Sequence, residues 1–231
     1  MDAKAFLKIR TEFIRFYYDR ASEGFLNIQT AIENEAPPFD DPPYSEDPEP
    51  PYLIEWLDAE TGKNILGSSC IALLSESLKL YFNTLQDYVI RFRFTDEKKA
   101  FKQGFVAAYM EVLSEILTVD WKTANIDIEL IEQIVLARNR GEHGGDLTTF
   151  SISHDQHTLQ KHPKPFFANQ SELENLKDER DELPSWLRPT LEITRERLFA
   201  ATFEVEKLAA FIDGQSEKIW EWQKKSRGDV I

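Results

Sequence analysis

Residues 71–92, IALLSESLKLYFNTLQDYVIRF, carry the strongest structural signal in the sequence. Large apolar side chains recur in this stretch at steps of three and four residues, at Ile71, Leu74, Leu78, Tyr81, Leu85, Tyr88 and Phe92. Because an α-helix turns once every 3.6 residues, this spacing places all of them on one face. The pattern predicts a long helix whose apolar seam packs against other helices.

Four further segments show helical periodicity: residues 3–34, 101–116, 126–138 and 190–225, the last predicted as one long C-terminal helix. We expect their apolar stripes to face the core, including the aromatic-rich stripe of the first segment: Phe6, Ile9, Phe13, Phe16 and Tyr17. No internal repeat and no convincing strand pattern is found. Residues 1–231 are therefore predicted to form a single all-α domain, a bundle of four to five main helices.

Two helix starts have a local signature. Asn125 is expected to cap the helix that begins near residue 126, because its side chain can accept a hydrogen bond from the first turn. Ser171 and Glu174 have the spacing of a capping box and predict a short helix there.

The connection between the first two helices is acidic and rich in proline. Residues 35–53 contain seven of the eleven prolines, and residues 32–60 contain ten acidic and no basic residues. Proline disrupts helices and central strands, so residues 35–53 are predicted to form an extended loop. This acidic loop is either a solvated linker or a regulatory segment that binds a partner or covers a basic cleft.

Composition restricts the class of protein. The net charge of −14 disfavours nucleic-acid binding, but outside residues 32–60 the chain has 31 acidic and 27 basic residues, so its body is only mildly acidic. The single cysteine, Cys70, excludes a disulfide framework. The charged N-terminal segment does not resemble a signal peptide, and no uninterrupted apolar run reaches the roughly 20 residues of a membrane span. We expect a soluble, cytoplasmic protein with no membrane association.

A second stretch, VLARNRGEHGGD at residues 135–146, bears on function. Arg138 shares the apolar stripe of its helix, where a guanidinium needs an ionic partner, a cleft or an interface. His143 follows five residues later, which is about 140° around a regular helix. The two side chains converge only if the helix distorts, and Gly141 lies between them as the residue best able to permit this.

These residues resemble the Arg-x(4–6)-His motif of HEPN domains, in which a polar residue often follows the arginine directly. Here Asn139 follows Arg138, and a glycine follows His143. The expected helices on both sides of the motif agree with the all-helical fold of that family. The resemblance covers the helical body, whereas the acidic loop and an insert over residues 144–189 have no counterpart in it.

The resemblance implies metal-independent cleavage of single-stranded RNA, as in bacterial toxins and antiphage-defence effectors. The ribose 2′-hydroxyl attacks the adjacent phosphate and leaves a 2′,3′-cyclic phosphate and a free 5′-hydroxyl. His143 would transfer a proton, Arg138 would stabilise charge on the phosphoryl oxygens, and Asn139 would orient the ribose hydroxyl or the histidine. The family also implies a homodimer with Arg138 and His143 of both chains in one groove, and an antitoxin or other regulatory partner.

Three basic residues outside the motif are candidate substrate contacts. Arg140 lies in the same stretch, and Lys161 and Lys164 precede aromatic residues in the insert, a combination that suits single-stranded RNA unless these aromatic residues pack the insert against the body. His154 and His157 are three residues apart, which invites a metal interpretation, but no second cysteine accompanies them and the nearby Asp155 has no distinctive spacing. No metal site and no cofactor are therefore expected.

Two other interpretations of the motif stay open. It is a polar helix end, with His143 favoured by the C-terminal helix dipole and Arg138 paired with an acidic residue. Alternatively, it belongs to a non-catalytic HEPN-like interaction module that binds a partner protein or a nucleotide.

Overall fold

The structure, a computed structural model, describes most of the chain. The described residues are 2–42, 44, 46, 48–143, 150–175 and 187–228, and the side chains of residues 142, 143, 175, 227 and 228 are outside the description. Within these ranges the regular elements are helices, and strand-like pairing is limited to isolated bridges. The all-α class predicted from the sequence is confirmed.

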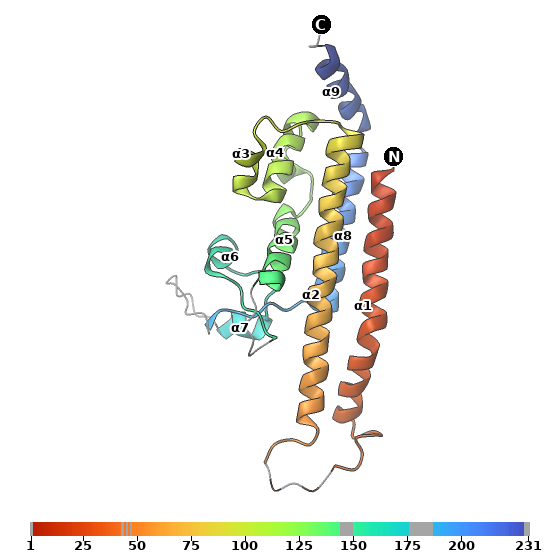
Figure 1. Cartoon of the computed structure of the whole chain (residues 1–231), viewed down its shortest axis with the longest axis vertical. Coiled ribbons are helices and arrows are strands. Elements are labelled where there is room, and N and C mark those ends of the chain that lie inside the picture. Colours follow the sequence, from red (N-terminus) through yellow and green to blue (C-terminus); the bar gives the residue numbers. More distant parts are fainter. Residues whose placement is uncertain are drawn as a thin grey trace.

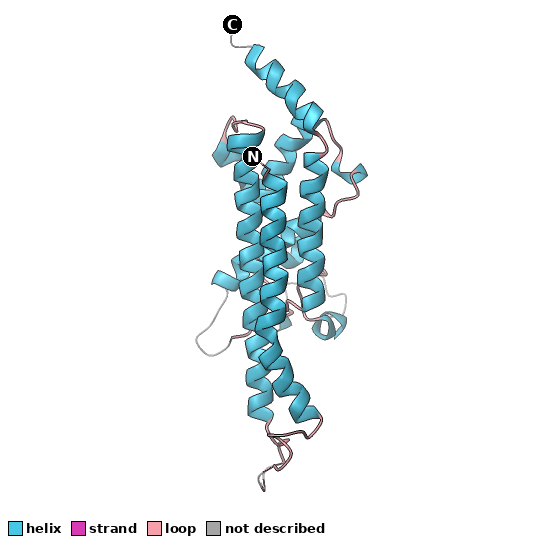
Figure 2. Cartoon of the chain, turned by 90° about the vertical axis from the view of Figure 1, so that its right-hand side faces the viewer, coloured by secondary structure: helices cyan, strands magenta, loops and turns pink. Residues whose placement is uncertain are grey.

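Three long helices form the body: α1 (Ala3–Glu33), α2 (Leu53–Thr84) and α8 (Arg195–Asp213), which run side by side (Figures 1 and 2). Two shorter helices, α4 (Phe105–Leu117) and α5 (Ile128–His143), follow one another on the side of α2 that faces away from α1 (Figure 1). Because α2 contacts α1, α8 and α5, it is the central helix of the fold.

The apolar seam predicted in residues 71–92 is buried, with one exception. Six of its seven side chains are at most 5% exposed. The exception is Tyr88, which is 63% exposed. Here α2 continues into a π-helical turn, Leu85–Val89, whose wider geometry shifts the register of the seam and turns Tyr88 towards solvent.

The apolar stripe predicted to face the core in α1 points to solvent instead. The helix buries a different set of side chains, among them Leu7, Ile14 and Tyr18. The predicted stripe is 38–60% exposed and consists of Phe6, Ile9, Phe13, Phe16 and Tyr17. The prediction is wrong because α1 carries apolar side chains on two opposite faces, and periodicity alone does not tell which of them packs.

The buried face of α1 also makes polar contacts with α8. Arg15 Nη1 lies 2.7 Å from Glu206 Oε1 and 2.8 Å from Thr202 Oγ1, and the Thr11 hydroxyl donates to the same carboxylate. The Arg15 and Glu206 side chains are only 14% and 20% exposed. Turning the other face inward would leave these partly buried groups unpaired, which is energetically costly.

The helix starts differ slightly from the predicted ones. α5 is capped by Asp127 rather than by Asn125, because the Asp127 carboxylate accepts a hydrogen bond from a backbone N–H of the first turn. The short helix α7 (Gln170–Asn175) is capped by Asn169, so Ser171 lies inside the helix instead of at its cap.

The C-terminal helix predicted over residues 190–225 is two helices. α8 ends at Asp213, and α9 (Ser216–Gly228) continues in a different direction (Figure 1). Gly214 stands at the break, where its backbone N–H bonds to the Ala210 carbonyl, as is common at helix ends. At the other end, Thr194 caps α8, so residues 190–194 precede the helix.

The acidic loop connects α1 to α2 at the end of the hairpin that extends beyond α5 (Figure 1). The Tyr52 hydroxyl donates to the Asp41 carbonyl at 2.9 Å, and the Tyr52 ring packs against Phe39 with centroids 4.9 Å apart. The described part of this loop therefore folds back on itself at a distance from the motif. This position gives no support to a loop that covers the end of α5.

The described part of the 144–189 insert packs beside α5 (Figure 1). It contains α6 (Gln156–Lys161) and α7, while α3 (Glu97–Ala100) precedes α4. Two antiparallel bridges, Ser153–Thr190 and Ala168–Leu191, fasten the insert to the segment before α8.

The central helix is also the most apolar one. Counted with its π-helical turn, residues Leu53–Val89, it is long and apolar enough to cross a membrane, which the search for uninterrupted apolar runs did not predict. However, 56% of its most apolar window is buried inside the protein, as in the core helix of a soluble protein. The structure is consistent with a soluble protein.

Gly67 generates a first prediction. A Cβ at this position of α2 would lie 2.6 Å from the Ile193 carbonyl oxygen, so alanine would displace the segment before α8. We expect Gly67→Ala to lower the free energy of unfolding by about 1–3 kcal/mol, the usual cost of overpacking. Urea denaturation measures the change.

The matched control is Gly24→Ala on α1, where an added Cβ would meet no atom within 4 Å. Because alanine favours helix more than glycine does, this variant should gain about 0.5–1 kcal/mol. Similar effects of the two substitutions would contradict the close approach at Gly67.

Candidate functional site

The motif forms the last turns of α5, which stays α-helical from Ile128 through His143. Gly141, which was expected to permit a distortion, lies in regular helix. The positions of Arg138 and His143 therefore stay about 140° apart around the helix axis. The side chain of His143 is outside the described residues. Within one chain, the helix does not bring these two positions to the same side.

Arg138 and Asn139 are in contact at this helix end. Arg138 Nη1 donates to Asn139 Oδ1 at 3.0 Å. Arg138 is half-buried and Asn139 is exposed. The amide thus helps to fix the guanidinium, a role closer to positioning the arginine than to positioning the histidine.

Arg138 and Gly141 line a pocket of about 590 Å³ between α2, α5 and the insert. A volume of this size is typical of small-ligand sites. Its other walls come from α2 and from three segments around the insert. The lining residues from these walls include Asn64, Ser68, Phe150, Asn169, Thr190 and Glu192.

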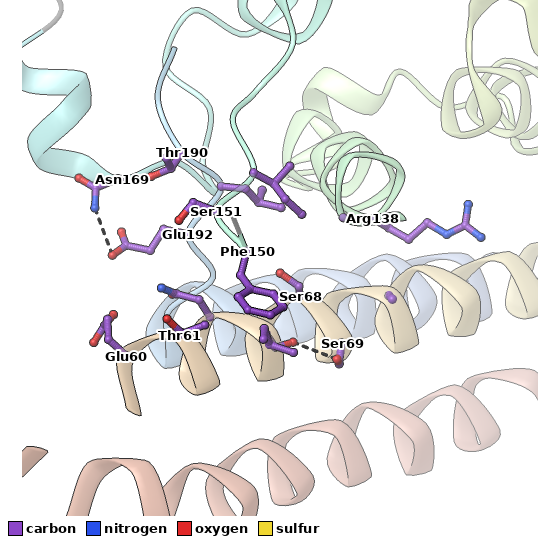
Figure 3. A pocket seen from close by; sticks show the side chains of 16 residues that line it. Glu60, Thr61, Ser68, Ser69, Arg138, Phe150, Ser151, Asn169, Thr190 and Glu192 are labelled. Carbon is purple, nitrogen blue, oxygen red and sulfur yellow. Dashed lines mark hydrogen bonds between the residues drawn. The ribbon is translucent and has the colours of Figure 1, made fainter. Parts of the chain in front are cut away.

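Figure 3 shows how the charged groups are distributed in the pocket. Arg138 lies at one end and its side chain extends away from the polar group at the other end, where Glu60, Asn169 and Glu192 lie. The Phe150 ring, 76% exposed, lies between the two ends. Among the described residues that line the pocket, Arg138 is the only basic one. An anionic group is therefore favoured only at the α5 end.

The carboxylates at the other end are engaged with cations. Glu60 Oε2 lies 2.8 Å from Lys63 Nζ, and Glu192 Oε2 lies 3.1 Å from Arg197 Nη1. Burial alone would raise the pKa of Glu60, but the hydrogen bonds from Lys63 and Gln29 lower it below the ordinary value. This end of the pocket can accept hydrogen bonds from hydroxyl or amino groups of a ligand.

Arg140 points to the insert rather than to the pocket. Its guanidinium donates to the Ser153 carbonyl at 2.7 and 3.1 Å and lies 3.9 Å from Asp155 Oδ2. Burial would raise the pKa of Asp155, but hydrogen bonds from Thr158 and the charge of Arg140 lower it. The candidate substrate contact Arg140 therefore anchors the insert to α5.

The candidate lysines of the insert are also separate from Arg138. Lys161 Nζ lies 2.5 Å from Glu132 Oε1, and His162 Nε2 lies 3.3 Å from the other oxygen of the same carboxylate. Lys164 is exposed. Neither lysine lines the pocket.

The two histidines considered as metal ligands differ in burial. His154 is buried and His157 is exposed. The described residues contain no group of three or more side chains suited to holding a metal ion.

Sequence reasoning found Arg138 but missed the rest of the pocket. Asn64 and Ser68 lie in the middle of a helix whose apolar seam dominated its interpretation, and Phe150 follows the motif without a recognisable spacing. One weak signal was available, namely the small and polar residues on the outer flank of that helix. Their role depends on what packs opposite them.

His154 generates a prediction about pH. Its ring is 3% exposed, with Nε2 3.0 Å from the Phe167 carbonyl and Nδ1 buried without a hydrogen-bond partner in the described part of the chain. Burial lowers the pKa of His154, only partly offset by the carbonyl and by Asp155. The unfolded chain then binds the proton at a higher pH than the folded protein does.

The stability contributed by the neutral His154 ring is therefore complete above about pH 6.5 and is lost as the pH falls below that value. Measured by urea denaturation at pH 7.5 and 5.5, the parent should lose more stability than His154→Gln. The control, His157→Gln at an exposed position, should behave like the parent. An unchanged pH dependence in His154→Gln would refute the assignment.

Comparisons with known proteins do not identify the chain. No family model matches the chain, and no curated protein and no solved structure matches it. The function therefore has to be argued from the motif, the pocket and the fold.

Proposed function

We propose that the protein is a HEPN-like, metal-independent endoribonuclease for single-stranded RNA, acting in the cytoplasm as a bacterial toxin or antiphage-defence effector. The observation that carries this proposal is the position of Arg138, which lines a pocket of about 590 Å³ at the end of a helix bearing the Arg-x(4–6)-His pattern. The all-α fold also fits the family.

In the proposed reaction, the 2′-oxygen forms a bond to the adjacent phosphorus while the bond from phosphorus to the 5′-oxygen breaks. A base removes the proton of the 2′-hydroxyl, and an acid supplies a proton to the leaving 5′-oxygen. Arg138 stabilises the negative charge that develops on the phosphoryl oxygens, for which a planar guanidinium is well suited. His143 is the proton-transfer residue, because imidazole titrates near neutral pH.

The regular geometry of α5 constrains how these residues cooperate. Positions 138 and 143 lie about 140° apart around one helix, so they face different sides of α5. We therefore assign Arg138 of one protomer and His143 of its partner to the same phosphate, in a homodimer whose motifs face a common groove. Two histidines in one groove also supply both a base and an acid.

The pocket suggests where the RNA lies. A base can stack on the exposed Phe150 ring, and the polar end formed by Glu60, Asn169 and Glu192 can exchange hydrogen bonds with the base or the ribose. To bind RNA, Arg140 would have to break its hydrogen bond to the Ser153 carbonyl, and Lys161 its ion pair with Glu132. We assign them to the support of the insert instead.

The proposal predicts metal-free RNA cleavage. In EDTA, the parent should convert single-stranded RNA to products with 2′,3′-cyclic phosphate and 5′-hydroxyl ends, resolved by gel electrophoresis. Arg138→Ala and His143→Ala should each reduce the rate by at least about 100-fold, the effect of losing a transition-state contact or proton-transfer group.

The control is Arg93→Ala, which removes an exposed arginine after α2 that pairs with Asp87; its cleavage rate should equal that of the parent. Inactivity of the parent towards varied RNAs, also in the presence of its regulatory partner, would sink the enzyme proposal and favour the non-catalytic interaction module.

A further inference from the structure

The exposed stripe of α1 is not needed for the fold. Phe6, Ile9, Phe13 and Phe16 follow steps of three and four residues, which is the spacing of a helix–helix seam. They lie opposite the face that packs against α2 and α8, and each is 57–60% exposed. A sustained seam of large apolar side chains on the solvent side of a helix indicates a surface that another helix covers.

The apolar surface extends from α1 to both neighbouring helices. Phe6 and Leu80 of α2 line a shallow groove of about 250 Å³. On the other flank, Phe203 of α8 is 54% exposed, and its ring lies 4.6 Å from the Arg15 guanidinium carbon. With roughly 200 Å² for each large side chain, the exposed area is on the order of 700 Å². This is close to the roughly 800 Å² per partner of a standard interface.

Charged side chains around the stripe have partners within the chain. Lys8 and Glu12 form one pair, with nitrogen and oxygen 3.8 Å apart, and Arg20 and Glu23 form another at 2.7 Å. Asp19 is also paired, because its Oδ1 lies 2.7 Å from Nε of Arg195 in α8. Two chains of net charge −14 repel each other, so their contact needs a locally neutral face. The four stripe residues provide one, and Arg10, which lines the groove beside them, donates to the Ser77 hydroxyl at 2.9 Å.

We propose that this stripe is an interface between two copies of the chain, with α1 packed against α1 of the partner across a two-fold axis. A two-fold contact joins the same patch of both subunits, so it requires a self-complementary surface. An uncharged stripe with heptad spacing, flanked by charged side chains that pair within their own chain, meets this requirement. The helix α1 lies on the opposite side of α2 from α5 (Figure 1), so an interface on α1 is separate from the proposed RNA groove and goes beyond the proposed function.

The test is the mass of the full chain in solution, measured by light scattering after size-exclusion chromatography. The variant Ile9→Glu/Phe13→Glu places two charges in the stripe, and we expect its mass to be half that of the parent. A milder variant, Phe13→Ser, should raise the dissociation constant at least tenfold. Because these side chains are exposed, the helical content measured by circular dichroism should not change.

The matched controls place a charge on equally exposed apolar residues elsewhere, Ile54→Glu (70% exposed) and Trp220→Glu (62% exposed), and should keep the parental mass. If the parent also dimerises through the RNA groove, the expected change is from tetramer to dimer, again twofold. A monomeric parent, or stripe variants with the mass of the parent, would overturn the proposal. Since the readout is mass, it does not depend on ribonuclease activity.

Discussion

Burial of the apolar seam of α2 is the constraint on which the rest of the structure depends. The seam fixes α2 as the helix that touches α1, α8 and α5. The other flank of α2 carries small or polar residues, Ser68 and Ala72 among them, and these do not fill the space in front of α5. Gly67 lets the main chain before α8 approach closely. The pocket is thus a consequence of where α2 has bulky side chains and where it does not.

The same arrangement separates two surfaces with different chemistry. On the α5 side, Arg138 and an exposed aromatic ring border a pocket with one polar end, as suits a nucleic-acid strand with a charged backbone and stacking bases. On the α1 side, the surface is apolar and its flanking charges are paired, as suits a protein helix. Because α2 lies between them, the two surfaces can be occupied at the same time.

The sequence predicts the features that depend on one helix and fails where two elements meet. The α2 seam was predictable because its bulky apolar side chains recur with helical spacing over more than five turns. The register shift that exposes Tyr88 was not predictable. The buried face of α1 was not predictable, since Arg15 and Thr11 are apparent as inward-facing only once Glu206 of α8 is in place. The motif was found at a helix end, but its pocket is assembled from segments far apart in the chain, and no spacing rule connects Asn64 with Phe150.

In the proposed dimer, Arg138 of one protomer and His143 of its partner act on the same phosphate. The most direct measurement mixes two inactive proteins, Arg138→Ala and His143→Ala, after subunit exchange, and assays RNA cleavage in EDTA. Only the mixed dimer contains an intact arginine and an intact histidine on opposite chains. We expect cleavage to return in the mixture, at less than the parental rate because the mixed groove holds one histidine instead of two, whereas parent subunits mixed with an excess of the double variant should lose it. A mixture that stays inactive while the parent cleaves RNA would contradict the account.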